Sequence, residues 1–309
     1  MKEIREVIMA KQSLLTLSAM QTIAGKAIRD LKNGGKRETR NVIELCRSFT
    51  KCPHQHDFWD MVKSFTAFTG SKYDPLLHRV AASVREDSLK TLAINLGCTA
   101  FAGGVDRIRS NHAKGIDHWW LQRFHSSSLN QQDISMWNER GIYVFLIDLK
   151  READFSKRFF SLAAHNVRST FVLLIQNDQP DFNWITQAAQ YDNVCFLSAP
   201  SVLDNIGNLL VENRALFGVL RNYLDIEDIQ TEKQRISQWI ELGCVIIAYD
   251  LLQDAPHMEQ VESYYEELVS VRKKGSVEIF LCDLQRDVLL VQEMLLGQRP
   301  FPEYNASIV

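Results

Sequence analysis

The sequence lacks a long uninterrupted apolar segment. Near the N-terminus, Ile8 and the run from Leu14 to Leu17 are separated by the polar residues Lys11 and Gln12. A membrane-spanning helix needs about 20 predominantly apolar residues, and a signal peptide needs an unbroken apolar centre. We therefore expect neither a transmembrane segment nor a signal peptide.

Cysteines are few and widely spaced, at positions 46, 52, 98, 195, 244 and 282. Cys195, Cys244 and Cys282 fall inside or beside segments that we predict to be strands, where cysteine behaves as a small buried apolar residue. Such spacing does not indicate a disulfide framework and is typical of proteins in a reducing compartment. We therefore expect a cytoplasmic protein.

Two common catalytic motifs are also missing. The serines at 126–128 are not part of a Gly-x-Ser-x-Gly turn, so a serine nucleophile is not indicated. Gly97, Gly103 and Gly104 do not follow a predicted strand, so they are a weak signal for a phosphate-binding loop. The sequence therefore predicts no catalytic residues.

The net charge of -3 hides an asymmetry between the two parts of the chain. Residues 1–124 contain 20 Lys and Arg against 12 Asp and Glu, and the remainder contains 15 against 26. The first part is thus about +8 and the second about -11. Either the two parts complement each other, or the basic part contacts nucleic acid, anionic lipid or an acidic partner.

The segment 141–178 predicts the unit on which the second part is built. Residues 142–147 and 171–175 are short apolar runs of the kind found in strands that are buried on both faces. Between them, Phe155 and Phe159 recur at helical spacing. Two strands joined through a helix are expected to be parallel, with a right-handed crossover.

The alternation of strands and helices is predicted for the whole second part of the chain, and the first part is predicted to be all-helical. Helices are predicted at 2–31, 37–49 and 57–69, with Asp57 as an N-cap, and helical periodicity then runs from 76 to about 102, where Gly103-Gly104 interrupts it. Strands are predicted at 119–124, 142–147, 170–176, 194–198, 215–222, 244–249 and 277–282. Helices are predicted at 130–140, 154–165, 181–190, 201–213, 226–241, 257–273 and 284–296.

The predicted fold class is α/β: a partial, open parallel α/β barrel of six or seven strand–helix units, preceded by the all-helical region. A doubly wound sheet is the main alternative. We divide the chain into a helical N-terminal region at 1–115, the barrel at 116–298 and a C-terminal tail at 299–309.

The order and spacing of residues 75–298 resemble the partial barrel of radical S-adenosylmethionine (radical SAM) proteins, in particular a bacterial subgroup with a helical N-terminal extension. Asn138 to Tyr143 is similar to that family's helix end and second strand, and Val261 to Asp283 is similar to its last helix and strand. Asn222-Tyr223 and Gly243-Cys244 fall where later strands end and begin.

The motifs that carry the family's chemistry are absent. The family binds a 4Fe-4S cluster through Cys-x3-Cys-x2-Cys, but the corresponding place, His125 to Leu129, contains no cysteine. Its Gly-Gly-Glu-Pro turn, which holds the methionine part of the cofactor, is replaced by Asp148 to Glu152, with no glycine for close backbone approach. The resemblance therefore implies a degenerate member with no 4Fe-4S cluster, no other cofactor and no binding of SAM.

Candidate ligand-binding residues follow the predicted strands, because ligands in parallel α/β folds bind at the carboxyl ends of the strands. These residues are Asp148, Asn177, Ser198, Asn222, Asp250 and Asp283. Together they could bind a cation or a polyol. Alternatively, they cap the following helices or start turns.

A weaker alternative is a metal site at Cys52, His54 and His56, because a His-x-His pair suits zinc. The segment is predicted to be a loop between two helices, so the two imidazoles are not forced to one side. An exposed histidine pair is the ordinary explanation, and we predict no metal.

The function that these observations predict is a non-catalytic radical SAM-like protein, acting as a binding, regulatory or partner-interaction module. Its expected partner is another protein, such as an intact radical SAM relative, with a homo-oligomer as a further possibility. The alternative is a cluster-independent enzyme that binds a small polar substrate or a metal at the carboxyl ends of the strands.

Overall fold

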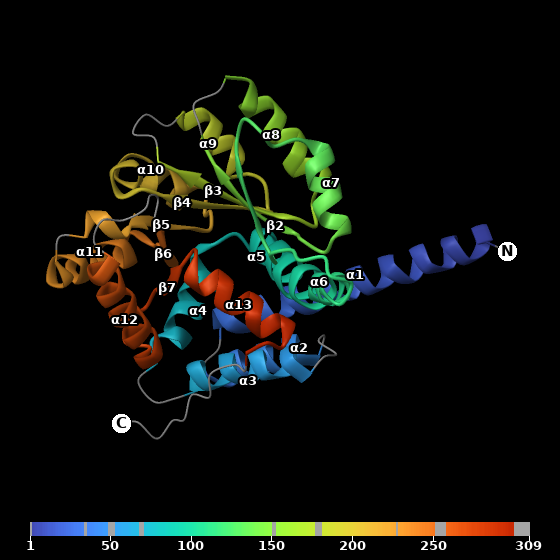
Figure 1. Ribbon diagram of the computed structural model, residues 1–309, viewed down its shortest axis with the longest axis horizontal. Helices are drawn as coiled ribbons and strands as arrows, with labels where there is room; N and C mark the ends of the chain where they lie inside the picture. The colour runs from blue at the N-terminus through green and yellow to red at the C-terminus, as the bar shows by residue number, and fades with distance from the viewer. Residues whose placement is uncertain are drawn as a thin grey trace.

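The computed structural model describes residues 2–33, 36–48, 53–67, 71–149, 153–176, 181–226, 228–250 and 258–299. Helices precede a curled parallel sheet that is surrounded by further helices (Figure 1). The helices of the first part are α1 Lys2–Asn33, α2 Lys36–Ser48, α3 Pro53–Ala67, α4 Tyr73–Ser83, α5 Glu86–Ala93, the π-helix η1 Ile94–Gly104, and α6 Val105–His112.

The second part alternates strands and helices. Its strands are β1 Gln122–His125, β2 Val144–Asp148, β3 Thr170–Ile175, β4 Val194–Ser198, β5 Phe217–Asn222, β6 Ile246–Asp250 and β7 Phe280–Asp283. Its helices are α7 Gln131–Glu139, α8 Ala153–His165, α9 Phe182–Ala188, α10 Pro200–Glu212, the short 3-10 helix η2 Tyr223–Asp225, α11 Ile229–Leu242, α12 Met258–Lys274 and α13 Arg286–Leu296.

The seven strands form one sheet in the order β1-β2-β3-β4-β5-β6-β7, and every neighbouring pair is parallel. A doubly wound sheet would reverse the strand order at a switch point. The observed sequential order and the curl of the sheet confirm the predicted open parallel barrel. Each predicted strand begins and ends within three residues of the observed one.

Both faces of the sheet are buried, which explains why its strands are almost continuously apolar. Alternate residues such as Phe145, Phe171 and Phe196 pack outward against the surrounding helices. The residues between them, including Leu146 and Leu174, form a second cluster on the concave side. That inner cluster also receives residues from η1 and α13.

The N-terminal helices are bound to the amino-terminal edge of the sheet. The Arg79 guanidinium on α4 donates a hydrogen bond of 3.0 Å to the carbonyl oxygen of Cys244, just before β6. The Asn95 amide on η1 donates one of 2.9 Å to the carbonyl of Val167, just before β3. These contacts cover the amino-terminal edge of the sheet.

Gly103-Gly104 does not interrupt the helical region, so that prediction was wrong. η1 ends at Gly104 and α6 begins at the next residue, Val105. A Cβ atom on Gly104 would lie 2.3 Å from the carbonyl oxygen of Gly141, which itself has a φ of +99°. The glycine is therefore needed for close approach of two backbone segments and not for ending a helix.

The predicted start of the third helix was also wrong. α3 begins at Pro53, where the fixed φ of proline suits the first helical position. Asp57 therefore lies inside the helix and is not its N-cap. The chain from residue 300 onward, which holds nearly all of the predicted C-terminal tail, lies outside the described residues. Among the helices that are described, none is long and apolar enough to cross a membrane.

The contact between Gly104 and Gly141 generates a prediction. Gly104→Ala should lower the free energy of unfolding by about 1–3 kcal/mol, because the new methyl group forces two backbones apart. Gly97→Ala is the matched control in the same helix, since a Cβ there meets nothing within 4 Å. It should raise stability by about 0.5–1 kcal/mol because alanine favours helix. Urea denaturation measures both, and equal effects would contradict the packing argument.

Candidate ligand-binding site

The carboxyl edge of the sheet carries polar side chains that point toward the concave side. Leu146 and Ala248 belong to the inner cluster, and side chains two residues apart on a strand share a face. Asp148 at the end of β2 and Asp250 at the end of β6 therefore point into the open end of the barrel. This end is called the mouth below.

Arg123 of β1 joins these two carboxylates. Its Nε donates a hydrogen bond of 2.7 Å to Asp148 Oδ2 and its Nη2 one of 2.9 Å to Asp148 Oδ1. Its Nη1 donates a third, of 2.7 Å, to Asp250 Oδ2. One side chain thus connects the first, second and sixth strands across the curl of the sheet.

The two carboxylates of this bridge are largely buried, whereas the arginine is partly exposed. The Asp250 side chain is 1% exposed and that of Asp148 14%, while Arg123 keeps 31% of its side chain exposed. The hydrogen bonds from Arg123 to Asp148 and the charge of Asp250 raise the pKa of Arg123, so the guanidinium stays charged. One positive and two negative charges leave the mouth with a net charge of about -1 when both carboxylates are ionised.

Amide and imidazole groups complete the mouth. Gln285 Nε2 lies 3.3 Å from Asp250 Oδ1, and Gln176 Nε2 lies 3.4 Å from Asp148 Oδ1. His125 Nδ1 lies 4.0 Å from Asp148 Oδ2 on a side chain that is 59% exposed. The mouth therefore offers several hydrogen-bond donors around a carboxylate pair that is bridged by one arginine.

Two other predicted site residues act as caps. Asn222 is the register partner of Asp250, and its Oδ1 accepts a 3.0 Å hydrogen bond from the backbone N–H of Leu224. Asp283 points to the outer side, where Oδ2 accepts a 2.7 Å bond from the Tyr223 hydroxyl. Its Oδ1 accepts the N–H groups of Gln285 and Arg286 at the start of α13. Capping, the alternative that the sequence left open, thus describes both residues.

The remaining predicted residues do not join the mouth. Ser198 follows the outward-facing Phe196 on β4, its side chain is fully buried, and its hydroxyl has no hydrogen-bond partner in the described part of the chain. Asn177 lies outside the described residues. The structure therefore brings together Asp148 and Asp250, with Asn222 beside them.

Positions 54 and 56 of the weaker metal alternative lie on helix α3 and not in the expected loop. Cys52 and the side chain of His54 lie outside the described residues. Within the ranges that the structure describes, no three His, Cys, Asp or Glu side chains gather as a metal site.

Arg123 was missed as a site residue by reasoning from the sequence. A signal existed: Arg123 is the one charged residue of a predicted strand, 119–124, that is mostly apolar and aromatic. Its partners could not be deduced, because Asp250 lies more than a hundred residues away and on a strand that is not a neighbour of β1.

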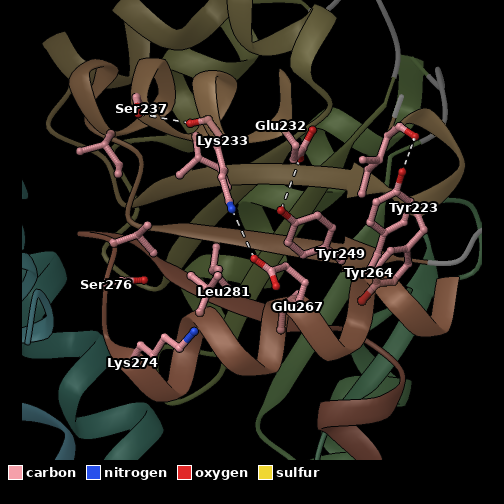
Figure 2. A pocket seen from close by; sticks show the side chains of 16 residues that line it. Tyr223, Glu232, Lys233, Ser237, Tyr249, Tyr264, Glu267, Lys274, Ser276 and Leu281 are labelled. Atoms are coloured by element: carbon pink, nitrogen blue, oxygen red, sulfur yellow. Dashed lines mark hydrogen bonds and ion pairs between the residues drawn. The ribbon is translucent and has the colours of Figure 1, made fainter. Parts of the chain in front are cut away.

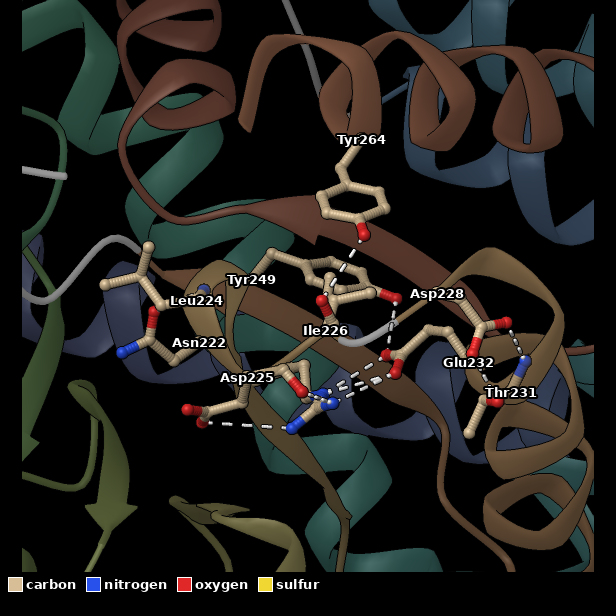
Figure 3. Close-up of polar contacts among 10 residues, drawn as sticks. Asn222, Leu224, Asp225, Ile226, Asp228, Thr231, Glu232, Tyr249 and Tyr264 are labelled. Atoms are coloured by element: carbon tan, nitrogen blue, oxygen red, sulfur yellow. Dashed lines mark hydrogen bonds and ion pairs between the residues drawn. The ribbon is translucent and has the colours of Figure 1, made fainter. Parts of the chain in front are cut away.

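A second buried charge pair lies on the outer face of the same sheet (Figure 3). Arg221 of β5 is 3% exposed and Glu232 of α11 is 6% exposed. Arg221 Nη2 lies 3.2 Å from Glu232 Oε2, and the Tyr249 hydroxyl donates a 3.4 Å hydrogen bond to Glu232 Oε1. This pair fixes α11 to β5 and β6 rather than facing the mouth.

The fold and the mouth together define an open parallel α/β barrel with an arginine-bridged polar site at the carboxyl edge. Comparisons of the chain with protein-family models, curated proteins and solved structures find no match. Function is therefore argued from the site itself.

The bridge predicts a large cost of removing Arg123. Arg123→Leu leaves the Asp250 carboxylate buried without its cation, which should lower the free energy of unfolding by about 3–5 kcal/mol at pH 7.

Urea denaturation at pH 7 measures this change. Arg29→Leu is the control, because Arg29 is 56% exposed in its ion pair with Glu86 and its loss should have little effect. Equal destabilisation by both substitutions would mean that the bridge has no special role.

Proposed function

We propose that this protein binds a small polar ligand at the mouth and does not transform it, as a non-catalytic radical SAM-like binding module. The observation that carries this proposal is the bridge from Arg123 to Asp148 and Asp250. A carboxylate that acts as a general acid or base must be free to exchange a proton with its substrate. Here both carboxylates already accept charge-assisted hydrogen bonds from one permanently charged group.

The cysteines support the absence of cluster chemistry in this proposal. Burial raises the pKa of Cys195 and of Cys244 to about 12 each, so both are protonated thiols at neutral pH. Metal ligation and radical SAM chemistry need thiolates. Cys282 faces the inner apolar cluster, and burial raises its pKa as well. Together with the cysteine-free segment His125 to Leu129, these features favour a protein without a 4Fe-4S cluster.

The charge of the mouth selects the ligand class. An anion would meet a net negative charge, and a metal cation would have to displace the guanidinium of Arg123. A neutral, oxygen-rich molecule such as a polyol avoids both costs. Its hydroxyl groups could accept from Arg123, Gln176 and His125, which are partly exposed. By the family resemblance, the module would serve an intact radical SAM relative as its protein partner.

Anaerobic reconstitution with ferrous iron and sulfide tests the first half of the proposal. The full-length protein should yield no stoichiometric cluster absorbance near 400 nm and no protein-bound iron after desalting, because burial raises the pKa of each thiol in the described part of the chain. Incorporation of about four irons per chain would refute this half, since that is the content of the family's cluster.

Ligand-observed NMR with ribose, citrate and putrescine tests the second half. Ribose should bind, and citrate should not. Gln176→Ala should weaken ribose binding about threefold to tenfold by removing one hydrogen-bond donor. Asn205→Ala on the exposed face of α10 is the control and should change nothing.

The same spectra separate binding from turnover. An unchanged ribose spectrum after prolonged incubation is expected of a binding module, whereas new product signals would favour the alternative of a cluster-independent enzyme. Binding of citrate without ribose would contradict the proposed ligand class.

A further inference from the structure

A cavity lies on the outer face of the barrel, between α11 and α12 and against β6 and β7 (Figure 2). Its volume is about 430 Å³, which falls within the range of small-molecule pockets. Its walls are mainly aliphatic, with Ile236, Ile240, Leu268, Val271 and Leu281 among the lining residues. It is separated from the mouth by the sheet, because Asp148 and Asp250 point to the concave side.

The polar groups in the inner wall of this cavity are already satisfied by the protein. The Tyr249 hydroxyl donates to Glu232 Oε1, and Glu232 is paired with Arg221. The Tyr264 hydroxyl donates a 3.3 Å hydrogen bond to the carbonyl oxygen of Ile226. Burial raises the pKa of Tyr249, so its phenol stays neutral. A bound molecule would therefore meet an inner surface that behaves as apolar.

The rim of the cavity is charged and has an excess of one cation. Lys233 Nζ lies 3.4 Å from Glu267 Oε1, so these two charges cancel. Lys274 lines the cavity at the end of α12 and forms no ion pair within the described part of the chain. Its side chain is exposed, and Ser276, two residues later in the chain, also lines the cavity. Figure 2 shows Lys274 and Ser276 on the same side of the cavity.

We propose that this cavity binds an amphipathic anion, of the class of medium-chain fatty acids. The hydrocarbon chain would lie between α11 and α12, against Ile236 and Leu268, and the carboxylate would pair with Lys274. The apolar wall would gain from excluding water, and the single unpaired ammonium selects a negative head group over a neutral or positive one. This site is independent of the ligand proposed for the mouth, and either can fail without the other.

Isothermal titration of the full-length protein with octanoate, decanoate and dodecanoate, below their critical micelle concentrations, tests the proposal. Saturable binding of one molecule per chain is expected. Affinity should rise about tenfold for each pair of added methylenes until the cavity is filled. Dodecylammonium should bind at least about tenfold more weakly than dodecanoate, because its charge repels Lys274.

Substitutions at the rim locate the site. Lys274→Glu should weaken dodecanoate and strengthen dodecylammonium, which reverses their order, and Lys273→Glu is the matched control because that neighbour does not line the cavity. Both positions are exposed, so folding is not at risk. Val271→Phe should fill part of the cavity and abolish binding of the longest chain.

Three outcomes would overturn the proposal. They are the absence of saturable binding, equal effects of the two lysine substitutions, and an unchanged preference for dodecanoate in the Lys274→Glu variant. The last comparison needs no substitution in the protein interior, so it holds even if Val271→Phe proves unstable.

Discussion

Burial of both faces of the parallel sheet is the constraint on which the rest of this structure depends. Seven strands that are apolar on both sides need cover on the convex and on the concave side. The helices between the strands supply the outer cover. Because the barrel is open and incomplete, the inner cover has to come from elsewhere in the chain, and η1 and α13 contribute it. Through η1 and α6, the N-terminal region thus shares the core of the barrel.

The two edges of the sheet differ in what they carry. Contacts such as Arg79 to the carbonyl of Cys244 bind the N-terminal helices to the edge where the strands begin. The edge where the strands end carries the polar side chains of the mouth.

Two arginines stabilise this frame in different ways. Arg123, which is partly exposed, connects strands that are not neighbours in the sheet, so it constrains the curl. Arg221, which is buried, connects a strand to a covering helix on the outer face. Each pairs with a carboxylate that would be costly to bury alone. The outer pair leaves an apolar cavity beside it, so the sheet separates a polar mouth from a cavity suited to hydrocarbon.

The sequence by itself determined the class of fold. Short apolar runs such as 142–147 alternate with segments of helical periodicity, such as that of Phe155 and Phe159. This local pattern indicates parallel strands covered on both faces, and the structure has strands and helices in these places. The sequence also placed Asp148 and Asp250 at strand ends, because strand ends follow from the same pattern. For Gly104, the rule that a glycine pair interrupts a helix failed. Glycine is required there because the backbone of Gly141, thirty-seven residues away, lies too close for a Cβ atom.

Only the tertiary structure decided which polar residues meet. Asp148 and Asp283 look alike in the sequence, each following an apolar strand, yet one is bridged by Arg123 at the mouth and the other caps α13 on the outer side. A single residue of register decides between the two faces, and predicted strand ends are uncertain by more than that. The pairing of Arg123 with Asp250 depends on the curl of the whole sheet, which is a property of all seven strands together and is encoded in no single segment.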